Sequence, residues 1–278
     1  MRVGHFAIIP PLEKLPTPSL IYGENITQYR LLYTSFDNGA LIDSSIRFQF
    51  DQHKLFIRND IFHKQIDFMI SYDIEKGVGD HVLCIDAKKK QISTSISAKT
   101  IPYPLLNYIL PYLYSIESTG LLFHSCSIRI NDSVYLFVGP SETGKSTTSI
   151  LFDRYKTDLF DIEVLNDEKN ALLIENDNVL GVGMGGSARF HSDNGGKLKG
   201  LFFLEQAEFC NVSSISKIEA LLRLQQVMFL PFGIREFLEF ATDSTLALLD
   251  RFPPKLFKFT KTPDMPEWFI KNVVEAES

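Results

Sequence analysis

The chain has 278 residues, of which 45% are hydrophobic and 22% are charged, values typical of a globular protein with a sizeable core. Its net charge of −6 argues against binding to nucleic acid or to an anionic membrane surface, because no basic excess is present to neutralise phosphates. The short apolar patch at the N-terminus is broken by Pro10 and Pro11, and no apolar run is long enough for a membrane span. The three cysteines, Cys84, Cys126 and Cys210, lie far apart without metal-binding spacing, which predicts buried thiols in a reducing cytoplasm.

Residues 1–100 predict a β-rich N-terminal domain, whose role the sequence does not indicate. Residues 46–60 alternate apolar and polar side chains around a turn near Asp51 to His53. Residues 80–97 repeat this pattern around Lys88–Lys90, a run that we interpret as a solvated hairpin turn rather than a binding patch.

Helical spacing begins at residue 104, and we place a domain boundary near residue 101, with a second domain over 101–278. Residues 104–113 predict a connector helix in which Pro111 causes a kink or a break. Asn131–Ser133 predicts the turn of a hairpin, followed by a helix from about Gly144 and a strand over 161–167. A second hairpin over 170–183, a strand over 198–206 and helices over 216–230 and 235–252 complete a mixed α/β pattern.

The strongest motif is GPSETGKS, residues 139–146, which satisfies GxxxxGK[ST] at every fixed position. It follows an apolar strand and opens a helix, so backbone N–H groups and the helix N-terminus are expected to form an anion site. Lys145 would reach the β- and γ-phosphates of a nucleotide, and the hydroxyl of Ser146 would ligate Mg²⁺. We therefore predict that the nucleotide phosphates bind the segment made of Gly139, Pro140, Ser141, Glu142, Thr143, Gly144, Lys145, Ser146 and Thr147.

Phosphoryl transfer to a hydroxyl also needs a carboxylate, and Asp167–Glu168 lies at the end of an apolar strand, one helix and one strand after Lys145. These two acids suit either a magnesium and base site or an ordinary polar turn that opens a hairpin. His124, on a predicted strand beside the loop strand, suits either a satisfied core histidine or an active-site residue.

Six glycines between Gly181 and Gly196 exclude a stable helix and predict a mobile loop. Arg189 and Lys197 in this stretch suit either closure over phosphates or an exposed linker.

Four segments together resemble the C-terminal domain of the HPr kinase/phosphorylase family and its bacterial relatives. They are GLLFHSCSIRINDSVYLFVGPSETGKSTTS, VLNDEKNALL, GVGMGGS with KLKGLFFLEQAE, and LFKFTKTPDMPEWF, covering about residues 103–270. The resemblance implies a phosphoenolpyruvate carboxykinase-like fold that uses ATP and Mg²⁺. It also implies that Asp167 is the catalytic base, that Glu168 is a metal ligand, and that His124 and Lys145 act beside the phosphates. The relatives form rings, so a homo-oligomer is an expectation of the same kind.

The sequence departs from the family pattern at Glu142-Thr143, at Thr147, at Glu168 and at Gly183-Met184. It also lacks the HPr-docking signature, so a serine of another protein or of a precursor peptide is the favoured acceptor rather than HPr. We therefore expect an ATP-dependent serine kinase. The alternatives are a small-molecule kinase and a nucleotide-binding regulatory or scaffold protein with weak or no catalysis.

Overall fold

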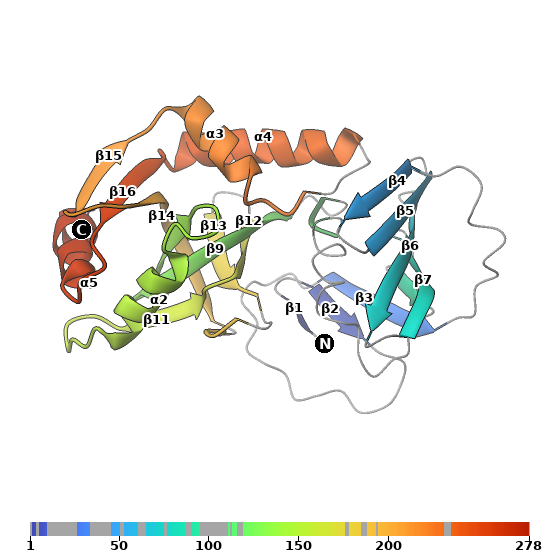
Figure 1. The fold of residues 1–278 in the computed structure, drawn as a ribbon, viewed down its shortest axis with the longest axis horizontal. Coiled ribbons are helices and arrows are strands. Elements are labelled where there is room, and N and C mark those ends of the chain that lie inside the picture. The colour runs from blue at the N-terminus through green and yellow to red at the C-terminus, as the bar shows by residue number, and fades with distance from the viewer. Residues whose placement is uncertain are drawn as a thin grey trace.

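The fold is known from a computed structural model. It describes residues 2–3, 6–9, 27–33, 46–50, 53–60, 65–74, 77–86 and 91–94 as backbone strands. It describes residues 111, 113–115, 119–175, 178–184, 188–192, 194–230 and 235–277 with side chains, except at 175, 236 and 277. Figure 1 shows these elements in chain order. Residues 101–110, where the domain boundary and most of the connector helix were predicted, lie outside this set. Pro111 and residues 113–115 are helical.

The N-terminal strands form one eight-stranded sheet, which confirms the prediction that this part is β-rich. Its order is β1-β2-β3-β8-β7-β6-β5-β4. The strands are β1 (Arg2–Val3), β2 (Phe6–Ile9), β3 (Thr27–Tyr33), β4 (Ile46–Phe50), β5 (His53–Asp60), β6 (Gln65–Ile74), β7 (Gly77–Asp86) and β8 (Gln91–Thr94). Both predicted hairpins are present, with Phe50 paired to His53 and Asp86 paired to Gln91. The lysines between β7 and β8 lie outside the described residues.

The rest of the chain is a mixed α/β unit with a second, mostly antiparallel sheet of eight strands. These strands are β9 (Gly120–Ile130), β10 (Ser133–Val138), β11 (Ile162–Asn166), β12 (Lys169–Glu175), β13 (Asn178–Gly183), β14 (Gly195–Gln206), β15 (Asn211–Ser214) and β16 (Lys255–Phe259). The helices are α2 (Lys145–Arg154), α3 (Lys217–Gln225), α4 (Arg235–Arg251) and α5 (Met265–Phe269), followed by short turns η3 (Ile270–Val274) and η4 (Glu275–Glu277).

The two predicted hairpins of this unit are confirmed. β9 and β10 pair across a two-residue turn, where Asn131 has a φ of 53°, a conformation that asparagine tolerates better than most residues. β12 pairs antiparallel with β13. The predicted mobile loop over 181–196 is wrong in part, because Gly181–Gly183 belongs to β13 and Gly195–Gly196 to β14, where the two strands pair. At Gly181 a Cβ atom would lie 2.6 Å from Val134, so these glycines serve close strand packing.

Two apolar layers hold the sheet. On one face, aromatic rings of β10, β14, β16, α2 and α5 pack together; Phe137 and Phe202 lie 5.6 Å apart and each contacts Phe269. On the other face, α3 and α4 bury Ala220, Leu224 and Leu248. The cap of α3 is formed by Ser216, whose side chain accepts the Glu219 N–H at 3.1 Å. The loop strand β10 is therefore fixed from both sides.

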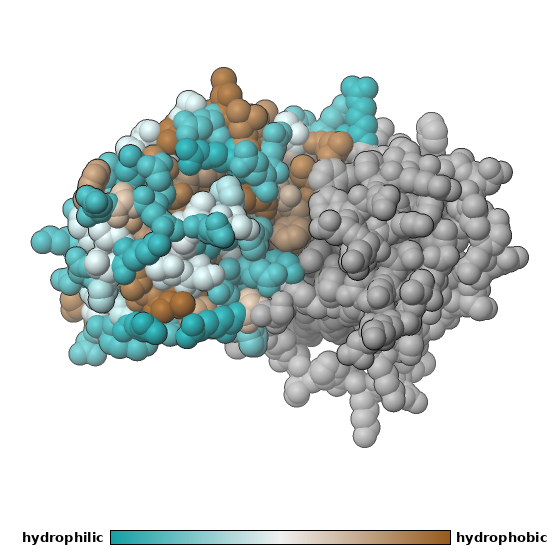
Figure 2. All heavy atoms as spheres, viewed as in Figure 1, coloured by the Kyte–Doolittle hydropathy of each residue, from teal (hydrophilic) through white to brown (hydrophobic). Residues whose placement is uncertain are grey.

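Figure 2 shows a largely hydrophilic face on this unit, with apolar residues gathered over α3, where Ile218 and Leu222 are exposed. Among the described residues, no helix combines the length and the hydropathy that crossing a bilayer would require.

Candidate phosphate-binding and transfer site

Four strands of the second sheet run in the same direction and end at the same edge. β10 is parallel to β14 and β14 to β16, while β10 and β11 are both antiparallel to β9. The GPSETGKS loop follows β10, and Asp167 follows β11; Gln206 ends β14, and Lys261 comes just after β16. The carboxyl ends of parallel strands commonly form a ligand crevice, because the connecting loops converge there.

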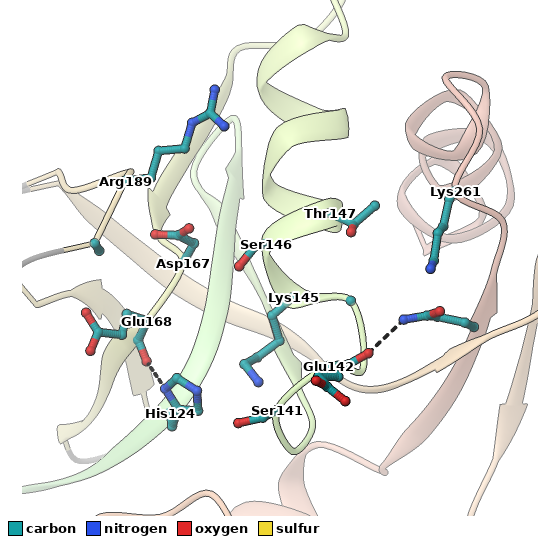
Figure 3. A pocket seen from close by; sticks show the side chains of 13 residues that line it. His124, Ser141, Glu142, Lys145, Ser146, Thr147, Asp167, Glu168, Arg189 and Lys261 are labelled. Carbon is teal, nitrogen blue, oxygen red and sulfur yellow. Dashed lines mark hydrogen bonds between the residues drawn. The ribbon is translucent and has the colours of Figure 1, made fainter.

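A cleft of about 540 Å³ opens at this edge (Figure 3). This size suits a nucleotide or another small ligand. The residues that line the cleft are His124, Ser141, Glu142, Gly144, Lys145, Ser146, Thr147, Asp167, Glu168, Ala188, Arg189, Gln206 and Lys261. Most of the predicted site residues therefore share one cavity, although they come from separate strands and turns.

The remaining loop residues face a second cavity. Gly139, Pro140 and Thr143 line a space of about 520 Å³ on the side of Phe203 and Arg223. Glu142 and Gln206 border both cavities, so the loop forms the wall between them. The sequence motif indicated one binding surface, whereas the folded loop borders a separate cavity on each of its two sides.

The conformation of the loop depends on two residues with positive φ. Gly144, the residue before α2, has a φ of 107°, and a Cβ atom there would lie 2.5 Å from the ring of Phe259. Glu142 has a φ of 70°, in the left-handed region that glycine adopts at least cost. The carbonyl of Glu142 accepts a hydrogen bond of 2.8 Å from the Gln206 side chain, which ties the loop to β14.

Lys145 is buried beneath the loop. Its Nζ donates to the carbonyl oxygens of Gly139 at 2.6 Å and Pro140 at 2.8 Å. Burial lowers the pKa of Lys145 below its usual value. The buried position also holds the ammonium group against the backbone of the loop. A phosphate in the loop would offer this ammonium group a charged acceptor in place of two neutral carbonyls.

His124 lies on β9 at the rim of the cleft and not in the core. Its Nδ1 lies 2.8 Å from the Glu168 carbonyl oxygen, which can only accept, so Nδ1 carries a proton and Nε2 is the basic nitrogen. Burial lowers the pKa of His124, the charge of Lys145 lowers it further, and the hydrogen bond to Glu168 opposes both. The neutral imidazole has a lone pair at Nε2, so it can accept a proton there and can donate one only after it is protonated.

Asp167 and Glu168 occupy the bend between β11 and β12, just before the β12–β13 hairpin, and both line the cleft; their role as a magnesium and base site stays a prediction. The fully buried Asn166 shapes the turn, because its Oδ1 accepts the N–H groups of Glu168 at 2.8 Å and Lys169 at 2.7 Å. The Asp167 Oδ1 accepts the N–H of Phe190 at 3.3 Å. The Glu168 carboxylate lies 3.2 Å from Lys169 Nζ, which offsets part of its charge.

The two cations of the glycine-rich stretch have different positions. Arg189 lines the cleft, and its guanidinium group lies 5.3 Å from the Phe190 ring and points away from Lys145 (Figure 3). Lys197 lies in β14 opposite Ser133, at the start of β10, and is therefore at the far end of the strand from the loop. The prediction that Lys197 could close over phosphates is wrong, because Lys197 lies near the start of β14 and the cleft lies at the other end of this strand.

Gln206 and Lys261 were missed by the sequence analysis. Gln206 is the last residue of β14 and Lys261 lies two residues after the end of β16, which points to this cleft only when the strand order is known. Lys261 is exposed on the side of the cleft near Thr147 (Figure 3).

The donor set fits a magnesium ion that also binds phosphate oxygens. A serine hydroxyl and one or two carboxylates, with water and phosphate completing the shell, suit this hard cation. Ser146, Asp167 and Glu168 line the same cleft. Among the described residues no group of three or more His, Cys, Asp or Glu side chains is arranged to hold a metal ion on its own.

Comparisons with known proteins leave the site without a named relative: no protein-family model matches the chain, and no curated protein matches it significantly.

Proposed function

We propose that this chain is an ATP- and magnesium-dependent kinase that transfers the γ-phosphoryl group to a hydroxyl, with a serine of a protein or peptide as acceptor. The observation that carries the proposal is that Lys145, at the N-terminus of α2, and Asp167, just after β11, line one cleft, because β11 runs parallel to β10 on the opposite side of β9. The proposal includes the HPr kinase-like class and the phosphoenolpyruvate carboxykinase-like core, which the four resembling segments support.

In this mechanism the loop amides and Lys145 hold the phosphates by charge-assisted hydrogen bonds. Ser146 and Glu168 would hold Mg²⁺, which supplies charge neutralisation between the β- and γ-phosphates. Asp167 orients the acceptor hydroxyl and takes its proton as the new oxygen–phosphorus bond forms and the bond to the β-phosphate oxygen breaks, releasing ADP. The Nε2 of neutral His124 would accept a proton beside the transferring group, and only the protonated ring would donate a hydrogen bond to a phosphate oxygen.

A specific observation favours a second candidate, a nucleotide-binding regulatory protein without transfer. Glu142 places an exposed carboxylate at the mouth of an anion site, in a backbone conformation that is costly for a non-glycine residue. This arrangement weakens phosphate binding relative to a glycine at the same position, which suits a sensor better than a fast enzyme.

The deciding experiment uses γ-labelled ATP, magnesium and a lysate of the native host, with the full chain as enzyme. The kinase proposal expects a labelled protein or peptide, identified by mass spectrometry, that is absent with Asp167→Asn. A labelled small molecule would move the acceptor to that class. ATP binding without consumption or labelling by the wild type would contradict the kinase proposal and favour the regulatory candidate.

A further inference from the structure

The short segment Ala188–Ser192, here named the acceptor strip, runs along the Asp167 side of the cleft. Ala188 and Arg189 line the cleft, and the N–H of Phe190 donates to Asp167. His191 forms a bridge with Asn166, and the N–H of Ser192 donates to the Leu165 carbonyl at 2.8 Å. The strip therefore contacts the residues that precede and include the proposed base.

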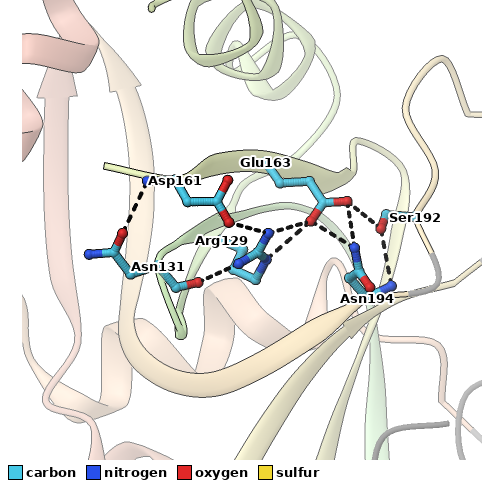
Figure 4. Close-up of polar contacts among 6 residues, drawn as sticks. All are labelled: Arg129, Asn131, Asp161, Glu163, Ser192 and Asn194. Atoms are coloured by element: carbon cyan, nitrogen blue, oxygen red, sulfur yellow. Dashed lines mark hydrogen bonds and ion pairs between the residues drawn. The ribbon is translucent and has the colours of Figure 1, made fainter. Parts of the chain in front are cut away.

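One carboxylate, that of Glu163 on β11, anchors the end of this strip (Figure 4). Ser192 Oγ donates to Glu163 Oε1 at 2.6 Å, and Asn194 Nδ2 lies 3.0 Å from each Glu163 oxygen. On the other side Arg129 donates to Glu163 Oε2 from Nε at 3.1 Å and from Nη2 at 2.8 Å. Both oxygens of Glu163 are thus used, one mainly toward the strip and one toward β9.

The charge of Glu163 is stabilised by these donors. Its half-buried position alone would raise the pKa of Glu163, but the hydrogen bonds from Ser192, Arg129 and Asn194 outweigh burial and lower the pKa.

Gly183 on β13 allows this strand to lie close to both β11 and the strip. A Cβ atom at Gly183 would lie 2.7 Å from the Leu165 oxygen and 3.1 Å from the Ser192 oxygen.

The neighbouring carboxylate of Asp161 provides an internal comparison. It accepts from the same Arg129 at 2.9 Å, but its side chain is 69% exposed. None of its described contacts reaches the strip, and its N–H donates to the Asn131 side chain at 3.0 Å. Two acids therefore share one arginine, and only Glu163 connects that arginine to the strip.

We propose that Glu163 is a positioning residue for phosphoryl transfer: it fixes the acceptor strip against β11, so that the Phe190 amide aims the Asp167 carboxylate and Arg189 stays beside the acceptor. This role rests on the proposed kinase function. The Asp167 carboxylate accepts a hydrogen bond from the strip, so movement of the strip would move the carboxylate away from its productive position. Glu163 is not among the residues that line the cleft.

The test compares Glu163→Gln with Asp161→Asn in the full chain. Glu163→Gln keeps the shape but loses the charge and presents an NH₂ group to a site where every partner is a donor. We expect kcat to fall about ten- to a hundredfold with the KM for ATP within about twofold of wild type. Asp161→Asn should retain wild-type kcat and KM.

A readout independent of catalysis accompanies the kinetics. In Glu163→Gln without nucleotide, the Phe190 and Ser192 amides should exchange hydrogen faster, and trypsin should cleave faster after Arg189, while both rates stay unchanged in Asp161→Asn. Ser192→Ala removes only one link to Glu163 and should give a smaller change in the same direction, which guards against a folding defect in Glu163→Gln.

Unchanged exchange, unchanged kcat, or equal losses in Glu163→Gln and Asp161→Asn would each overturn the positioning role. A wild-type protein that labels no acceptor would instead overturn the kinase function itself, and this result is seen before any variant is made.

Discussion

The Lys145 ammonium group lies 2.6 Å from the carbonyl oxygen of Gly139, so the lysine of the phosphate loop bonds to the first residue of its own loop. The lysine side chain is thus held by hydrogen bonds to the backbone of the same loop that is proposed to surround a nucleotide phosphate. In the proposed function, a bound phosphate would replace these neutral acceptors with charged ones, and this exchange would contribute to the affinity.

Replacing Lys145 with alanine should weaken ATP binding by about tenfold or more, because charge-assisted hydrogen bonds to phosphate are lost. Isothermal titration calorimetry with Mg·ATP measures this change. Lys197→Ala is the matched control, since Lys197 lies at the far end of β14 and should bind ATP like the wild type. Equal affinities for Lys145→Ala and the wild type would show that the loop does not hold the phosphates.

Asp167→Asn should reduce kcat by about a hundredfold to ten-thousandfold, the range for loss of a general base. ATP affinity should stay within a fewfold of wild type, because asparagine Oδ1 can still accept the Phe190 N–H and Lys145 is untouched. Single-turnover transfer and ATP titration measure the two quantities. Asp153→Asn on the exposed surface of α2 is the control, and retained transfer by Asp167→Asn would remove Asp167 from the role of base.

The pKa of His124 should lie below 6.5, the ordinary value for a histidine, so the imidazole is neutral at about pH 7 in the free protein. Since its folded pKa lies below its unfolded value, the unfolded state binds the proton first as the pH falls. The free energy of unfolding should therefore decrease as the pH falls through about 6.5, with no contribution from His124 at higher pH.

NMR titration of the His124 ring protons measures this shift. Lys145→Met should move the pKa of His124 upward, because the lysine charge disfavours the imidazolium form. In His124→Gln the corresponding part of the pH dependence of stability should disappear. A His124 pKa at or above 6.5 in the wild type would contradict the expectation.

Glu142→Gly should stabilise the loop and strengthen phosphate binding. Glycine relieves the positive φ of 70°, and its lack of charge removes repulsion from the mouth of the cleft. Glu142→Gln separates these effects, since it removes the charge and keeps the strained backbone. We expect tighter Mg·ATP binding in both variants and a higher Tm only in Glu142→Gly; weaker ATP binding in both would mean that Glu142 contributes directly to the nucleotide site.

The thiol of Cys126 should resist alkylation in the native protein. Burial raises its pKa to about 12, although the hydrogen bond with Ser149 opposes this shift. Iodoacetamide at about pH 8, followed by mass spectrometry, should modify the partly buried Cys210 and leave Cys126 unmodified. Both should react after denaturation, and rapid native labelling of Cys126 would show that the layer between β9 and α2 opens.

Much of the second unit was predictable because its elements are locally encoded. The β9–β10 hairpin follows from apolar runs around Asn131, and α2 follows from the glycine loop and its strand. The glycine-rich stretch was misjudged because glycines at 181 and 195 serve close packing between strands, which composition cannot distinguish from a flexible loop.

The residues of the candidate site also divide into those that a local sequence motif predicts and those that only the strand pairing places there. Lys145 and Ser146 belong to one contiguous motif, whose spacing defines the anion site before any tertiary contact forms. Gln206, Lys261 and Glu163 carry no such local pattern. Their positions depend on which strands pair and in which direction.

The sequence by itself determined a GxxxxGK[ST] loop before a helix and an acid pair at a strand end, because both are consequences of backbone geometry over a few consecutive residues. Only the tertiary structure decided that Asp167 lies across the cleft from Lys145 and that Glu163 connects Arg129 to the strip beside it. The reason is that β9 pairs with β10 on one side and β11 on the other, and this pairing places side chains from distant parts of the chain at one edge of the sheet.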